Sequence, residues 1–367
     1  MHHESRQPLE DRYLEIRDVS CEFKPHITLG DRIAASFGAN VETRSVRAVD
    51  SVTLTIRRGE TLGLVGESGC GKSTLGRMAA GILTPTSGHV LLDGQAVNVD
   101  GIKTTTRVQT VFQDPFASLD PRMKVGAAVA EGPIAHGLVT AKDAGKYVAA
   151  WFDDVGLDAS FVDRYPHQFS GGQRQRIAIA RALAMQPELL ICDEPVASLD
   201  VSIQAQIINL LLDLRRRLDL TCLFISHDLS VVKHVSEQLA VMYLGRIVEQ
   251  GDAQELFEQP AHPYTRGLLS SVPRLMIEDD DIARFQPIGG ELPSPLSPPP
   301  GCHFAPRCRW RHEQCVEQKP LLKPVAQNLQ TRHDNESDSS SDQTELSHRS
   351  TIRLSMCHFS DQVLSGK

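Results

Sequence analysis

Short apolar runs alternate with amphipathic stretches along residues 13–258. Residues 61–65, 189–193 and 221–225 are almost continuously apolar, which is typical of strands buried on both faces of a parallel sheet. Each run is followed by polar residues, as expected where a ligand meets the carboxyl ends of parallel strands. The pattern therefore predicts one α/β unit in which helices wrap a largely parallel sheet.

Two longer stretches have helical features. Residues 203–218 carry apolar side chains at helical spacing, namely Ile207, Leu210, Leu211 and Leu214. Residues 126–157 are expected to be helical, with Pro133 and Gly137 as breakers. Residues 24–45 interrupt the first strands, and we expect them to form a loop or arm.

The composition changes after about residue 258. Residues 293–300 are rich in proline, which favours an extended spacer, and residues 301–322 are rich in cysteine and basic side chains. We predict an extension over residues 259–325 and a tail over residues 351–367. Between them, residues 326–350 are strongly polar and bury too little apolar surface to fold, so we predict a disordered insertion there.

Length and charge restrict the classes of protein to which this chain could belong. The 367 residues suggest about two domains, and the formal net charge of −8 argues against a nucleic-acid partner. No apolar run approaches the ~18 residues of a membrane-spanning helix, and residues 1–12 lack the apolar centre of a signal peptide. We expect a soluble, cytosolic protein that would serve a membrane only through partners.

The strongest chemical signal is the run G-E-S-G-C-G-K-S at residues 66–73, which fits the phosphate-binding loop G-x-x-x-x-G-K-[ST]. A predicted strand precedes it and a predicted helix, residues 72–82, follows it. We expect Lys72 to reach the β- and γ-phosphates of a nucleotide and Ser73 to bind Mg²⁺. A chance glycine turn before a helix is the alternative. The candidate nucleotide contacts are Gly66, Glu67, Ser68, Gly69, Cys70, Gly71, Lys72, Ser73 and Thr74.

Two adjacent acids end the apolar run at residues 189–193. Asp193 is a candidate Mg²⁺ ligand, and Glu194 is a candidate general base that polarises the attacking water. An apolar run that ends in two acids is common by itself, so this assignment depends on the phosphate-binding loop earlier in the chain.

A third signal is the run F-S-G-G-Q at residues 169–173. A helix is expected to begin there, so the small residues would offer a second phosphate-binding surface. The alternative is an ordinary helix cap made by Ser170. This run resembles the signature motif of ATP-binding cassette (ABC) ATPases, which implies that Ser170, Gly171, Gly172 and Gln173 contact ATP.

The resemblance implies further site residues in the same order as in ABC ATPases. Gln113 matches the Q-loop and is implied as a Mg²⁺ contact. Asp200 matches the D-loop, and His227 matches the switch histidine. Phe23 matches the aromatic residue that stacks on adenine, with Tyr13 as the competing assignment.

Residues 13–320 resemble the F-type ATP-binding subunits of the oligopeptide/dipeptide family of ABC importers. Beyond the ATPase motifs, the resemblance rests on H-P-Y-T at residues 262–265 and on the runs at 63–77, 113–122, 201–206, 242–249, 290–295 and 301–304. It implies an α/β fold of the ABC-type P-loop ATPase class over residues 13–258. The helical subdomain would span about residues 114–170, and a small cysteine-containing extension would follow the ATPase.

The resemblance also implies the assembly and its cofactors. A second ABC ATPase subunit, expected to be D-type, would pair head to tail with this chain, and ATP with Mg²⁺ would bind between them. Two transmembrane permease subunits and an extracytoplasmic solute-binding protein would complete a peptide importer at the cytoplasmic face of the inner membrane. The alternatives are an importer of nickel, glutathione or another small solute, and a soluble ABC ATPase without a transport role.

Four cysteines lie near the C-terminal end, with the spacing C-x5-C-x6-C for Cys302, Cys308 and Cys315, followed by the distant Cys357. The spacing differs from that of zinc fingers and ferredoxins. The family resemblance implies a [4Fe–4S] cluster held by these four thiolates. Zinc and reduced thiols without a metal are the alternatives.

Overall fold

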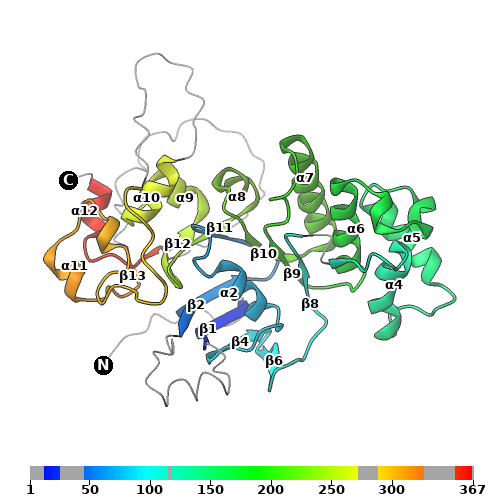
Figure 1. Ribbon diagram of the computed structural model, residues 1–367, viewed down its shortest axis with the longest axis horizontal. Helices are drawn as coiled ribbons and strands as arrows, with labels where there is room; N and C mark the ends of the chain where they lie inside the picture. The colour runs from blue at the N-terminus through cyan, green and yellow to red at the C-terminus, as the bar shows by residue number, and fades with distance from the viewer. Residues whose placement is uncertain (1–11, 25–44, 115–117, 272–287, 326–351, 366–367) are drawn as a thin grey trace, which may run out of the picture.

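The computed structural model describes residues 12–24, 45–114, 118–271, 288–325 and 352–365 (Figure 1). Most of the arm expected over residues 24–45 and the whole insertion expected over residues 326–350 lie outside these ranges.

A sheet of eight strands forms the centre of the described part of the chain, in the order β13-β14-β12-β11-β3-β10-β9-β8. The five strands from β11 to β8 are parallel, and the other three pair antiparallel. Every residue of β3, β9 and β10 is buried, as their apolar sequences predict. The bounds are β3 (Thr61–Val65), β8 (Val108–Val111), β9 (Leu189–Asp193), β10 (Thr221–Ile225), β11 (Gln238–Tyr243), β12 (Arg246–Asp252), β13 (Lys323–Pro324) and β14 (Leu354–Ser355).

A separate antiparallel sheet lies beside the central sheet in the order β2-β1-β4-β5. Its strands are β1 (Arg12–Phe23), β2 (Val46–Arg57), β4 (Ser87–Leu92) and β5 (Gln95–Ala96), and a small hairpin of β6 (Asn98–Val99) and β7 (Ile102–Lys103) follows. Apolar side chains of this sheet share a core with helix α2 and with one face of β3 and β10. The sequence analysis did not predict this second sheet.

Helices cover the central sheet and extend past its β8 edge, where α4, α5 and α6 form a group (Figure 1). Pro133 lies inside α4 and does not break it, which corrects our expectation, whereas Gly137 has a φ of 72° just past the helix end. The helices are α2 (Lys72–Ala79), α4 (Val125–Ala135), α5 (Ala144–Asp154), α6 (Gly171–Leu183), α7 (Val201–Leu218), α8 (Leu229–Val235), α9 (Ala253–Glu258), α10 (Pro263–Ser270), α11 (Glu313–Glu317) and α12 (Ser360–Ser365), with short 3-10 turns at η2 (Ala159–Asp163), η3 (Pro166–Gln168) and η4 (Ala305–Arg307). None of these helices is long and apolar enough to cross a membrane.

The C-terminal tail is part of the central sheet. Strand β14 pairs with β12, and the next residue, Met356, donates its N–H to the Val248 carbonyl at 2.7 Å. Arg353, whose side chain is 3% exposed, forms an ion pair at 2.8 Å with Glu249, which is fully buried. The Glu249 carboxylate also accepts the N–H groups of Ala261 and His262. One buried carboxylate thus joins β12, the start of α10 and the tail.

Candidate functional site

The carboxyl ends of the parallel strands converge at one edge of the central sheet. Ile225 of β10 lies opposite Leu64 of β3 on one side and Asp193 of β9 on the other, and Val111 of β8 lies opposite Cys192. The polar residues that follow these strands are therefore neighbours, although they are far apart in the sequence. This is the usual position of a ligand site in an open α/β sheet.

The loop after β3 turns tightly against the surrounding backbone. Gly66 and Gly71 have φ angles of 156° and 109°, and a Cβ on either would come within 2.2 Å of a backbone carbonyl oxygen. Only glycine fits such positions without strain. The turn ends at helix α2, which begins at Lys72, so backbone N–H groups at the helix start are available to an anion.

Lys72 and Ser73 begin helix α2, directly after the glycine turn. The Lys72 side chain is nearly fully buried, and its Nζ donates to the carbonyl oxygens of Gly66 at 2.8 Å and Glu67 at 3.1 Å. The Ser73 hydroxyl donates to Asp193 Oδ1 at 2.9 Å. Burial raises the pKa of Asp193, and the Glu194 carboxylate raises it further, whereas the Ser73 hydrogen bond lowers it. A hydroxyl and a buried carboxylate at this distance are oxygen ligands of the kind that Mg²⁺ prefers.

Glu194 and His227 form a second pair beside the loop. His227 Nδ1 lies 3.1 Å from Glu194 Oε2, and the Glu194 side chain is 13% exposed. Glu194 has a φ of 50°, which non-glycine residues rarely adopt, and its N–H donates to the Ile225 carbonyl at 2.9 Å. Strained backbone of this kind is common at functional sites. The Glu194 carboxylate contacts His227, which follows β10.

Gln113 and Asp200 are both exposed. Gln113 follows β8 by two residues, and so it lies at the same edge of the sheet as Asp193. Asp200 occupies the N-cap position of α7 without capping the helix through its side chain. Both side chains are available to a ligand or a partner.

The glycine pair after Ser170 begins helix α6. The Ser170 hydroxyl accepts the Gln173 N–H at 3.3 Å, and Gln173 Oε1 accepts the Ser170 N–H at 3.0 Å. This reciprocal capping box shows that Ser170 does act as a helix cap. It also leaves the Gly171 and Gly172 N–H groups at an open helix start, so capping and anion binding are compatible there.

Phe23 and Tyr13 lie at opposite ends of β1. Tyr13 is buried, donates its hydroxyl to Glu188 at 2.9 Å and packs under the Arg58 guanidinium, so its ring is fully engaged. The Phe23 ring is 47% exposed. Of the two aromatic residues, Phe23 alone offers a free ring face for stacking.

The four C-terminal cysteines gather in one region, although Cys357 is far from the others in the sequence. Burial raises the pKa of Cys357 to about 12, with added contributions from Cys302, Cys308 and Cys315. Burial likewise raises the pKa of Cys308 to about 11. Within the described ranges, however, no three His, Cys, Asp or Glu side chains converge as a metal ion requires. Thiols are donors that suit a soft metal, but the described residues do not form a site with three such donors.

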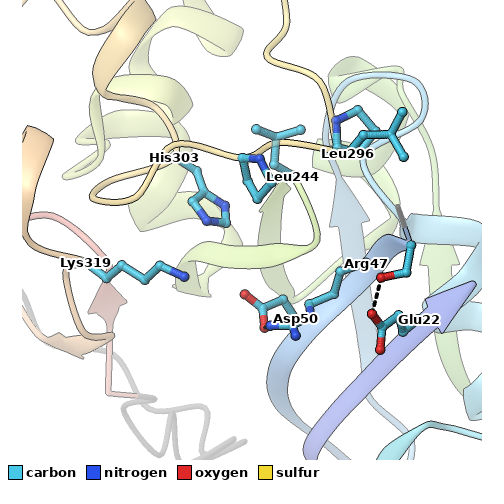
Figure 2. A pocket seen from close by; sticks show the side chains of 10 residues that line it. Glu22, Arg47, Asp50, Leu244, Leu296, His303 and Lys319 are labelled. Carbon is cyan, nitrogen blue, oxygen red and sulfur yellow. Dashed lines mark hydrogen bonds and ion pairs between the residues drawn. The ribbon is translucent and has the colours of Figure 1, made fainter. Parts of the chain in front are cut away.

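A cavity of about 280 Å³ separates the extension from the N-terminal sheet. Figure 2 shows His303 and Lys319 on the side of the extension and Glu22, Arg47 and Asp50 on the side of β1 and β2. Burial lowers the pKa of His303 to about 4, and neither of its ring nitrogens has a hydrogen-bond partner in the described part of the chain. The cavity has room for several water molecules.

The sequence analysis missed two residues that contact the phosphate-binding loop. Tyr264 accepts the Glu67 N–H through its hydroxyl, and Arg307 pairs with the Glu67 carboxylate. Tyr264 lies in the H-P-Y-T run, which we had noted only for its family resemblance. Arg307 immediately precedes Cys308. Its charge, among cysteines predicted to bind a metal, was the only sign in the sequence that it could have a role of its own.

Comparisons with known proteins agree with this geometry. The family described as ABC transporter matches residues 49–197, and the family described as oligopeptide/dipeptide transporter, C-terminal region, matches residues 248–315. A protein from Brucella abortus (strain 2308), named as a peptide import ATP-binding protein, is 53% identical over 288 residues, which are 76% of this chain and 84% of the relative. The oligopeptide transport ATP-binding protein AppF of Bacillus subtilis is 46% identical over 326 residues, 86% of this chain and 95% of AppF.

Among solved structures, cbiO1 from Clostridium perfringens, described as part of the ABC transporter complex cbiONQ, is 30% identical with a TM-score of 0.55. The match covers 68% of this chain and 92% of cbiO1, and so the expected ABC-type α/β fold is confirmed. From these matches and the strand-end geometry, we conclude that the chain is an ATPase and belongs to the ATP-binding subunits of the oligopeptide/dipeptide family of ABC transporters.

Proposed function

We propose that this chain hydrolyses ATP to power the import of di- and oligopeptides across the cytoplasmic membrane. The observation that carries the proposal is the C-terminal match over residues 248–315, because that region lies outside the general ATPase machinery. The names of the relatives from Brucella abortus and Bacillus subtilis support the same class of solute.

The proposed assembly contains a second ABC ATPase subunit of the D-type, two transmembrane permeases and an extracytoplasmic solute-binding protein. The chain would sit peripherally at the cytoplasmic face of the inner membrane and bind no nucleic acid. The finding that no described helix can cross a membrane is compatible with such an attachment through partners. The division into an ATPase over residues 13–258 and an extension over residues 259–325 remains part of this proposal.

In the proposed nucleotide site, the phosphates of ATP would lie on the loop of residues 66–74 and accept hydrogen bonds from the backbone N–H groups at the start of α2. Lys72 would exchange its two carbonyl partners for phosphate oxygens. Ser73, Asp193 and Gln113 would hold Mg²⁺, which neutralises charge on the phosphates when bound. Phe23 would stack on the adenine ring.

The proposed general base is Glu194, because its carboxylate lies at the strand ends beside the phosphate-binding loop. His227, in contact with Glu194, would hold that carboxylate and the attacking water in position. The Gly171 and Gly172 N–H groups at the start of α6 would contact ATP held by the partner ATPase, together with Ser170 and Asp200.

Uptake of labelled short peptides tests the function. We expect cells that carry the wild-type chain to accumulate label and cells that carry Glu194→Gln to lose uptake, because hydrolysis drives transport. Glu317→Gln is the control, since Glu317 is an exposed acid on α11. If peptide uptake is the same in all three strains, peptides are not the transported solute, and nickel, glutathione or another small molecule takes their place.

We further propose that Cys302, Cys308, Cys315 and Cys357 hold a [4Fe–4S] cluster. The support is chemical, because four thiols in this part of the chain are the ligand type that such clusters require. When bound, the cluster would cross-link the extension and the tail.

Iron and acid-labile sulfide measured on anaerobically purified protein test this assignment. We expect both in the wild type and a loss of both in Cys308→Ser, with Cys21→Ala as the control because Cys21 lies in β1. Zinc in place of iron, or neither metal, would contradict the cluster.

A further inference from the structure

Glu67, the second residue of the phosphate-binding loop, is held at three points. Its N–H donates to the Tyr264 hydroxyl at 2.9 Å. Its carboxylate accepts both terminal nitrogens of Arg307, at 2.9 and 3.1 Å. Its carbonyl oxygen accepts Lys72 Nζ at 3.1 Å. Two of these three partners lie beyond residue 258, outside the ATPase as the sequence delimits it.

The Arg307 contact is built for a fixed geometry. The side chain is only 7% exposed, and both carboxylate oxygens of Glu67 are engaged, which is the fork-to-fork arrangement that orients both partners. Arg307 Nε also donates to the Gly289 carbonyl at 3.2 Å, and one terminal nitrogen lies 3.5 Å from the Tyr243 hydroxyl. The guanidinium is therefore anchored independently of Glu67 and can act as a fixed support.

The Tyr264 contact is equally rigid. Tyr264 is fully buried, and its ring packs against Tyr243 at 4.6 Å and Phe304 at 5.4 Å between ring centroids. Burial raises the pKa of the Tyr264 hydroxyl far above its usual range, so the hydroxyl stays neutral and accepts the Glu67 N–H at all physiological pH values. Residues from β11, α10 and the start of η4 thus form one aromatic cluster behind the loop.

The third contact connects this support to the chemistry. Lys72 Nζ is placed by the carbonyl oxygens of Gly66 and Glu67, so the position of the Glu67 peptide sets the position of the ammonium group before ATP arrives. A phosphate-binding loop that is already ordered loses less conformational freedom when ATP binds.

We infer that Arg307 and Tyr264 of the C-terminal extension are positioning residues for ATP, acting through Glu67 on the phosphate-binding loop and Lys72. This inference rests on the proposed ATPase site and adds to it a dependence of ATP affinity on the extension. The extension thereby takes part in nucleotide binding without touching the nucleotide.

A double-mutant cycle on the purified full-length chain tests the inference. ATP affinity is measured by titration for the wild type, Arg307→Ala, Glu67→Gln and the double variant. We expect each single variant to weaken binding roughly tenfold, the size expected for loss of a charge-assisted hydrogen bond, and the double variant to be no weaker than either single one. In steady-state assays KM for ATP should rise by a larger factor than kcat falls.

Two further variants keep the test decisive. Arg311→Ala removes an exposed arginine of the same segment and should leave affinity unchanged. Tyr264→Phe removes only the hydroxyl and should weaken binding in the Glu67→Gln background as well, because the N–H contact is separate from the carboxylate. If Arg307→Ala does not fold, Glu67→Gln removes the same ion pair from the side of the loop.

The inference would be overturned if the double variant lost ATP affinity by the product of the two single-variant factors, or if Arg307→Ala bound ATP as tightly as the wild type. The ATPase assignment would stand in either case. A wild-type chain that fails to bind ATP would instead overturn the proposed function.

Discussion

Replacing Glu194 with glutamine is expected to lower the ATP hydrolysis rate by about 10²–10⁴-fold, the usual contribution of a general base, while ATP binding persists. The amide is nearly the same size as the carboxylate and can keep the contact with His227, but it cannot accept a proton from water. The phosphate-binding loop and the Ser73–Asp193 pair are left in place. Phosphate release and ATP titration on the same preparation separate the two effects.

His227→Ala and Glu317→Gln complete this experiment. His227→Ala should also slow hydrolysis, but by less, because it removes a group that holds the base and leaves the base itself. Glu317→Gln should hydrolyse ATP at the wild-type rate, since Glu317 is exposed and lies on α11. A Glu194→Gln protein that retains most of its hydrolysis rate would remove Glu194 from the role of general base.

Replacing Arg353 with alanine is expected to lower the free energy of unfolding by about 3–5 kcal/mol, the cost of leaving a buried partner charge uncompensated. Glu249 is fully buried and has two backbone N–H partners besides Arg353, so removal of the guanidinium leaves the carboxylate in an apolar interior. The Arg353 guanidinium also bonds to the Gln259 carbonyl, which loses that donor. Urea unfolding followed by circular dichroism measures the change.

The companion variants distinguish a lost charge pair from lost packing. Glu249→Gln combined with Arg353→Met removes both charges and keeps most of the volume, so its stability should lie much closer to the wild type than that of Arg353→Ala. Arg311→Ala, in an exposed position, should change stability by no more than about 0.5 kcal/mol. A double variant as unstable as Arg353→Ala would show that the ion pair is not the cause.

The sequence was sufficient for three of the five parallel strands and for the residues at their ends. The three apolar runs coincide with β3, β9 and β10, because a strand buried on both faces must be apolar throughout. The fold then brings Lys72, Ser73, Asp193, Glu194 and His227 together, since each lies at or directly after the carboxyl end of a parallel strand or at the start of the helix that follows.

The remaining features depend on contacts between distant segments. Strands β13 and β14 have two residues each, too few for any periodic pattern. They form because β14 pairs with β12 and β13 pairs in turn with β14. Arg307 and Tyr264 reach Glu67 across 240 and 197 residues of chain, and local spacing carries no trace of such contacts. The antiparallel sheet of β1, β2, β4 and β5 was missed because a long segment separates β1 from β2 in the sequence. Two paired strands joined in this way lack the short turn motif that marks a hairpin.

The pairing of β14 with β12 has a consequence for biosynthesis. Glu249 leaves the ribosome 104 residues before Arg353. Throughout that interval the Glu249 carboxylate lacks the guanidinium with which it pairs in the folded sheet. Strand β12 meanwhile presents an unpaired edge, which is a site for association with other chains. A nascent chain that stalls inside this interval is therefore more exposed to aggregation and proteolysis than one that has been completed.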